Sequence, residues 1–111
     1  MKRIFGTALL MLLASVLPAF SADTLKGTIS DKMCGADHKG QDPVACTRGC
    51  VKGGSPYVLV ESNDKILDIE NQKDPKIAEE LNKFAGKAVT VTGTMSKDGK
   101  SVKIASVSAG K

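Results

Sequence analysis

The sequence has no tryptophan, one tyrosine and three phenylalanines, so aromatic residues make up 4% of its 111 residues. Proteins that bind single-stranded nucleic acid stack bases on aromatic side chains and follow the phosphates with a basic groove. The formal net charge is +4, but basic and acidic residues are interspersed and no block of like charge occurs. The sequence therefore does not support a nucleic-acid-binding surface.

Residues typical of catalysis are also scarce, with one histidine and three cysteines in the chain. The cysteine spacing matches neither the C-x-x-C of thioredoxin-like enzymes nor the C-x-x-C-H of covalent haem attachment. No carboxylate pair, nucleophile–base set or phosphate-binding glycine loop can be nominated. We therefore nominate no catalytic residue, and the pattern favours binding over catalysis.

Long apolar runs are confined to the N-terminus, where Ile4–Val16 is almost unbroken and follows two basic residues. This run is short for a membrane span. Small residues then provide a cleavage site after Ser21 or Ala22. We expect a cleaved signal peptide at residues 1–21 and a mature chain that is periplasmic or secreted, without a membrane anchor. Cleavage would also remove two of the four net positive charges.

The remaining residues, 22–111, are enough for a single small domain. Alternating apolar residues and turn-forming residues predict five strands. They are expected at residues 24–30, 57–61, 65–70, 88–95 and 101–107. The domain is therefore predicted to be mainly β.

One helix is predicted between the third and fourth strands, capped by Asp74 and ending at Gly86. Three strands, a helix and two further strands is the order of the OB-fold, a five-stranded Greek-key barrel. In that fold the helix would close the open end of the barrel with Ile77, Leu81 and Phe84. Another small α+β sandwich is the alternative.

All three cysteines and the only histidine lie in one short segment, as Cys34, His38, Cys46 and Cys50. They form two pairs spaced by four residues, a spacing that places two side chains on one face of a helical turn. The segment falls in a long loop, about residues 32–55, between the first two strands. In an OB-fold this loop borders the ligand-binding face, so we take it as the candidate site.

The leading hypothesis for this segment is a metal site. Three thiolates and one imidazole form a Cys₃His ligand set, which binds zinc tetrahedrally and also suits copper, especially Cu(I). Asp31 and Met33 are candidate supplementary ligands. The predicted role is structural or metal-handling, with a metal ion or another protein as the partner.

Two other interpretations remain open, because three cysteines cannot all pair within one chain. A disulfide from Cys34 to Cys46 or Cys50 would make the protein a stapled interaction module without metal. Alternatively, the protein is a thiol redox partner that uses Cys46 and Cys50, with Arg48 and Lys52 lowering a thiol pKa.

Five stretches that cover most of the mature chain carry a resemblance to known proteins. They are Gly27-Thr-Ile-Ser-Asp31, Cys34-Gly-Ala-Asp-His38, Cys46-Thr-Arg-Gly-Cys50-Val-Lys-Gly-Gly, Tyr57-Val-Leu-Val60 and Ala85-Gly-Lys-Ala-Val-Thr-Val-Thr-Gly93. On these stretches the chain resembles a group of small exported bacterial OB-fold domains of unknown function. The resemblance implies an OB fold and an exported location, and it implies no activity.

Overall fold

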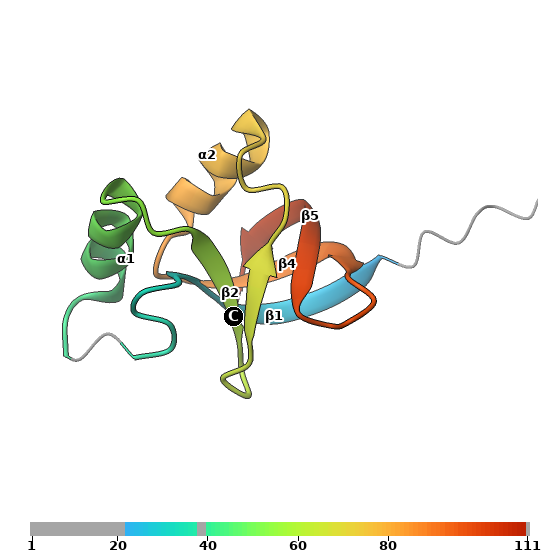
Figure 1. Cartoon of the computed structure of the whole chain (residues 1–111), viewed down its shortest axis with the longest axis horizontal. Coiled ribbons are helices and arrows are strands. Elements are labelled where there is room, and N and C mark those ends of the chain that lie inside the picture. The colour runs from blue at the N-terminus through green and yellow to red at the C-terminus, as the bar shows by residue number, and fades with distance from the viewer. Residues whose placement is uncertain (1–21, 38–39, 111) are drawn as a thin grey trace, which may run out of the picture.

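A computed structural model describes residues 22–37 and 40–110, so the predicted signal peptide lies outside the described residues. The elements, shown in Figure 1, are β1 (Asp23–Asp31), α1 (Pro43–Lys52), β2 (Tyr57–Glu61), β3 (Ile66–Ile69), α2 (Pro75–Lys83), β4 (Ala88–Met95) and β5 (Ser101–Ala109). Each predicted strand is present, and the bounds differ from the prediction by two residues at most. Within the described ranges, no helix is long and apolar enough to cross a membrane.

The five strands pair in a ring, in the order β1-β2-β3-β5-β4, and β4 pairs back with β1. Four of these pairings are antiparallel. The β3–β5 pairing is parallel and joins only Asp68 to Ser101 and Ile69 to Val102. The mainly β, five-stranded architecture predicted from the sequence is therefore confirmed. The shortest strand pairing in the ring is the one between β3 and β5.

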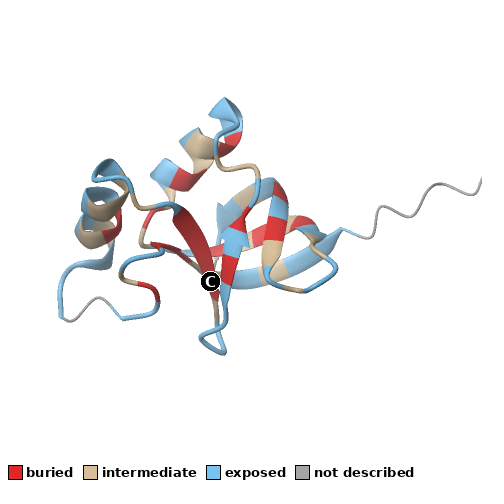
Figure 2. Cartoon of the chain, viewed as in Figure 1, coloured by how far each residue is buried: buried red, intermediate tan, exposed pale blue. Residues whose placement is uncertain are grey.

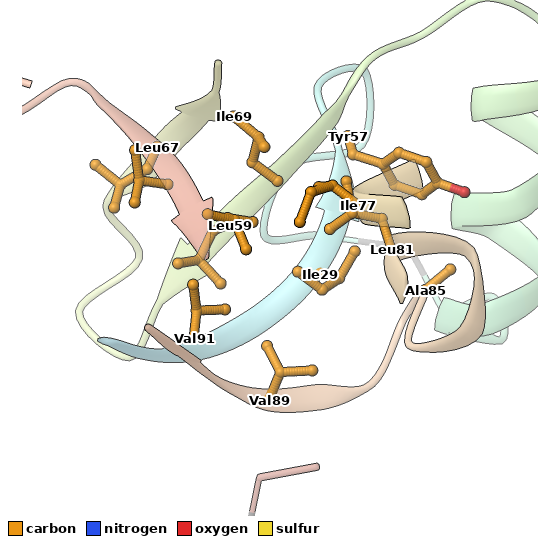
Figure 3. Packing of buried hydrophobic residues seen from close by; sticks show 12 residues of the cluster. Ile29, Tyr57, Leu59, Leu67, Ile69, Ile77, Leu81, Ala85, Val89 and Val91 are labelled. Atoms are coloured by element: carbon orange, nitrogen blue, oxygen red, sulfur yellow. The ribbon is translucent and has the colours of Figure 1, made fainter. Parts of the chain in front are cut away.

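The hydrophobic core fills the ring, and Figure 3 shows its side chains converging from the strands and α2. Inward residues alternate with outward ones along β4, where Val89 and Val91 are at most 1% exposed. All of β2 except its last residue is buried, which Figure 2 shows as a continuous buried stretch. The ring is thus closed around side chains rather than around an open channel.

Helix α2 packs against this core. It begins at Asp74, whose side chain accepts a hydrogen bond from the backbone N–H of Lys76. Ile77 and Leu81 are buried in the core, whereas Phe84 packs against the core and is only partly buried. A helix of this length is marginal in isolation, so its burial against the ring is what stabilises it.

Two amide side chains that follow β3 reinforce the ring where strand pairing is short. Asn71 donates from Nδ2 to the Ile104 carbonyl oxygen at 2.8 Å, and its Oδ1 accepts from the Ile104 N–H at 2.9 Å. Gln72 accepts from the Tyr57 N–H at 2.8 Å and donates to the carbonyl oxygens of Tyr57 and Ile69. These side chains therefore add hydrogen bonds to backbone groups of β2, β3 and β5.

We expect Asn71→Ala to lower the free energy of unfolding by roughly 1–3 kcal/mol, because it leaves a buried N–H and carbonyl without partners. Urea denaturation of the reduced protein measures this loss. Asn63→Ala is the matched control, since Asn63 caps only the Lys65 N–H in an exposed turn. An equal loss of unfolding free energy in both variants would show that water can replace Asn71 as the hydrogen-bond partner of the Ile104 N–H and carbonyl oxygen. The ring would then not depend on Asn71.

Candidate metal centre

Helix α1 carries two of the three thiols, those of Cys46 and Cys50. They lie one helical turn apart, as their four-residue spacing in the sequence predicts. It begins at Asp42, whose side chain accepts from the Val44 N–H, and Pro43 occupies its first position. Cys46 and Cys50 are both half-buried on this helix. The long loop between β1 and β2 therefore contains a regular helix of 10 residues where only short helical turns were expected.

The third thiol lies in the turn that directly follows β1. Asp31 holds this turn, because its carbonyl oxygen accepts from the Gly35 N–H at 2.8 Å and its Oδ2 accepts from the Cys34 N–H at 3.0 Å. The Ser30 hydroxyl donates to the Gly35 carbonyl oxygen at 2.7 Å. Gly35 has a φ of +58°, which glycine adopts without strain. Cys34 is thus fixed at the end of β1.

These two segments bring the three sulfur atoms together. The Cys34 Sγ lies 3.0 Å from the Cys46 Sγ and 3.5 Å from the Cys50 Sγ. The Asp31 carboxylate joins them, so that one ligand atom from each of the four residues lies within 4.8 Å of all the others. All three thiols are free. We call these four residues the Cys₃Asp cluster.

The Asp31 carboxylate is the most deeply buried member of the cluster. Its side chain is fully buried, and its Oδ1 has no hydrogen-bond partner among the described residues. The salt bridge found in the described part of the chain joins Lys32 to Asp68, so no lysine or arginine described there compensates Asp31. Burial of an uncompensated carboxylate is costly. A cation bound at the cluster would supply the missing partner.

Two of the thiols, those of Cys34 and Cys50, have raised pKa values. The hydrogen bond with Cys46 is the largest cause of the raised pKa of Cys34, although the hydrogen bond with Cys50 opposes it. The hydrogen bond with Cys34 likewise raises the pKa of Cys50, and burial and the Asp31 charge act in the same direction. A metal ion would reverse this balance, because it stabilises coordinated thiolates.

Arg48 does not lower the pKa of the Cys50 thiol, which the redox interpretation anticipated. Its Nη2 donates to the Asn82 carbonyl oxygen at 3.0 Å, next to the end of α2. The pKa of Cys50 is raised by its hydrogen bond with Cys34, rather than lowered by neighbouring basic residues. The expectation of a lowered pKa is therefore wrong for Cys50.

Comparison with protein-family models, with curated proteins and with solved structures found no significant match. Function is therefore inferred from the cluster itself. Three thiols and a buried carboxylate at these separations suit two kinds of chemistry. One is coordination of a metal ion, and the other is formation of a disulfide that includes Cys34.

A direct disulfide between Cys46 and Cys50 fits poorly. The Cβ atoms of helical residues four positions apart are about 5–6 Å from one another. A disulfide needs a Cβ–Cβ separation of about 3.5–4.5 Å. While α1 is intact, Cys34 is therefore the partner that each of the other two thiols can reach.

All four members of the Cys₃Asp cluster were nominated by the sequence analysis. Cys34, Cys46 and Cys50 converge, and Asp31, a candidate supplementary ligand, joins them. The predicted ligand His38 lies outside the described residues. Met33, the other supplementary candidate, is 79% exposed. Ser55 was missed: its hydroxyl accepts from the Met33 N–H at 3.2 Å and donates to the Asp31 Oδ2 at 3.5 Å, and its sequence context indicated only a loop.

Proposed function

We propose that this protein is an exported OB-like domain that binds one transition-metal ion, zinc or copper, through Cys34, Cys46 and Cys50. The observation that carries the proposal is the convergence of three thiols and a buried carboxylate within 4.8 Å. The ring order, with α2 between β3 and β4, supports the OB-like assignment. The apolar N-terminal run supports export. The role is structural or metal-handling, and it requires no catalytic residue.

The spacing of the sulfurs supports coordination by all three thiols. Two sulfurs bound to a tetrahedral zinc ion at about 2.3 Å lie roughly 3.8 Å apart. The observed separations from Cys34 are 3.0 and 3.5 Å, so each sulfur needs to move outward by less than 1 Å. The loop that carries Cys34 and the helix that carries the other two can provide this movement without refolding.

The fourth ligand depends on the metal. A carboxylate is a common zinc ligand but a poor one for Cu(I), which prefers thiolates and imidazole. Coordination by Asp31 therefore favours zinc, and coordination by His38 is compatible with either metal. Asp31 has the stronger structural support, because its buried Oδ1 lacks a partner among the described residues.

Anaerobic titration of the fully reduced protein with Zn²⁺ and with Cu(I) tests this proposal. We expect one equivalent to bind in competition with a chelator, and none to bind to a variant with all three cysteines replaced by serine. Asp31→Asn preserves the acceptor for the Cys34 N–H and removes the charge, whereas His38→Ala removes the imidazole. We expect the replacement of the true fourth ligand to lower affinity by at least the roughly 10–100-fold seen for residues that only support a metal ligand.

A reduced protein that binds neither metal above the level of the serine variant would overturn the proposal. In that case the disulfide-stapled interaction module and the thiol redox protein would be the remaining accounts of the cysteines. Equal binding by the wild type and by the serine variant would place the metal elsewhere on the chain, which would also overturn it.

A further inference from the structure

The arrangement of the cluster around Cys34 has a consequence for its oxidation. We infer that the metal site is redox-sensitive: two-electron oxidation joins Cys34 mainly to Cys46, leaves one thiol free, which is mainly that of Cys50, and releases the metal ion. Reduction of the disulfide restores the site. This inference rests on the proposed function for the metal, while the choice of disulfide rests on the thiol geometry alone.

The choice of disulfide follows from distance and from helix geometry. The Cys34–Cys46 sulfur separation of 3.0 Å is the shorter of the two that involve Cys34. The helical spacing of Cys46 and Cys50 disfavours their direct pairing. An odd number of cysteines then leaves one thiol over, and that thiol is Cys50.

The leftover thiol is not isolated. Its sulfur lies 3.5 Å from the Cys34 Sγ, within reach of a disulfide formed there. Attack by a thiolate on a disulfide sulfur is the elementary step of disulfide exchange. Cys50 can therefore displace Cys46 from Cys34, so the oxidised protein is a mixture of two disulfides that share Cys34.

Loss of the metal follows from the number of ligands. The Cys34–Cys46 disulfide removes two of the three thiolates, because a disulfide sulfur carries no charge and coordinates weakly. Only Cys50 and the fourth ligand remain, which is fewer than the three or four protein ligands of zinc sites. The metal keeps its oxidation state and leaves as the same ion.

The oxidant is a molecule of the disulfide class, either a small disulfide or an exported protein disulfide. The thiolate of Cys34 or Cys46 attacks one oxidant sulfur, forming a mixed disulfide and releasing one thiolate. The other cysteine thiolate attacks the mixed disulfide at the protein sulfur and releases the second thiolate. Two electrons pass from the cysteines to the oxidant. In the metal-free protein the two cysteine thiols first lose their protons to solvent, and in both forms the two released thiolates take up protons from solvent.

The sequence makes the experiment direct, because trypsin separates all three cysteines. Cleavage after Lys32, Lys39, Arg48 and Lys52 gives the peptides 33–39, 40–48 and 49–52, with one cysteine each. We would treat the metal-loaded and the metal-free protein with oxidised glutathione, alkylate the free thiols and identify linked peptides by mass spectrometry. Released metal would be measured with a chromophoric chelator in the same samples.

We expect free thiols to fall from three to one in both samples and the released metal to equal the disulfide formed. The main linked pair should be 33–39 with 40–48, and the minor pair 33–39 with 49–52. Cys50→Ser should give the first pair alone, Cys46→Ser the second alone, and Cys34→Ser no intramolecular pair. Dithiothreitol should restore the capacity to bind metal.

A dominant link between 40–48 and 49–52, or metal that stays bound to the oxidised protein, would overturn the inference and leave the proposed function intact. Absence of metal binding in the reduced protein would instead overturn the proposed function together with its redox sensitivity. The linked peptides from the metal-free sample separate these cases, because they report the pairing without reference to metal.

Discussion

Replacing Cys34 by serine is expected to weaken metal binding by about 10²–10³-fold. Structural zinc sites with four ligands bind with roughly 10–16 kcal/mol. One ligand's share, about 3–4 kcal/mol, corresponds to about that change in affinity. Cys34 is the most sensitive position, since it lies close to both other sulfurs and its backbone N–H is held by Asp31. Chelator competition on the reduced variant measures the effect.

Met33→Leu is the matched control, because it also removes a sulfur atom and lies next to Cys34. The Met33 side chain is 79% exposed, so we expect affinity within about twofold of the wild type. If both variants bind as tightly as the wild type, Cys34 is not a ligand. A loss in Met33→Leu comparable with that in Cys34→Ser would place the thioether in the site.

Gly86→Ala is expected to destabilise the fold more than any other single change considered above. Gly86 has a φ of +76°, and a Cβ there would lie 2.5 Å from backbone atoms of Pro43 and Val44 at the start of α1. Its N–H also donates to the Ile29 carbonyl oxygen at 2.7 Å. Strain at positive φ and the clash together cost about 2–6 kcal/mol. Urea denaturation of the reduced, metal-free protein measures this loss.

Gly49→Ala provides a control of opposite sign. Gly49 lies inside α1, and nothing comes within 4 Å of a Cβ at this position. Alanine is the better helix former, so we expect a gain of about 0.5–1 kcal/mol. If Gly86→Ala unfolds at the same urea concentration as the wild type, α1 moves freely at its start and does not depend on this contact.

Most of the fold could be predicted from the sequence, because local patterns and tertiary burial agree along the strands. Val89 and Val91 alternate with threonines and are buried as expected. The strand predicted at residues 24–30 includes Gly27, where a Cβ would lie 2.3 Å from the Val60 carbonyl oxygen. Gly86 was predicted to end the helix and has a left-handed conformation, but α2 ends three residues earlier, at Lys83.

The site could be predicted only in part. Cysteine spacing identified the three thiols, since few other roles place so many sulfurs in one segment. The full burial of Asp31 and the role of Ser55 depend on how the turn after β1 folds against the start of β2, and no local pattern encodes that contact. The hydrogen bonds of Asn71 to β5 and of Gln72 to β2 and β3 could not be predicted either, because in the sequence both residues resemble ordinary polar turn residues.

The cluster is divided between the turn after β1 and helix α1, so the local opening of α1 depends on the concentration of free metal. Cys34 lies in the turn after β1, while α1 has one buried residue, Thr47, and packs against the core through Val51, which is only partly buried. Such a segment opens locally at a lower free energy than the ring, and its amide protons exchange through that opening. A metal ion that binds only the closed form raises the cost of opening by about 2.7 kcal/mol at 100 times its Kd. Amide exchange in residues 43–52 would then slow in proportion to free metal, while exchange in the ring would remain set by global unfolding.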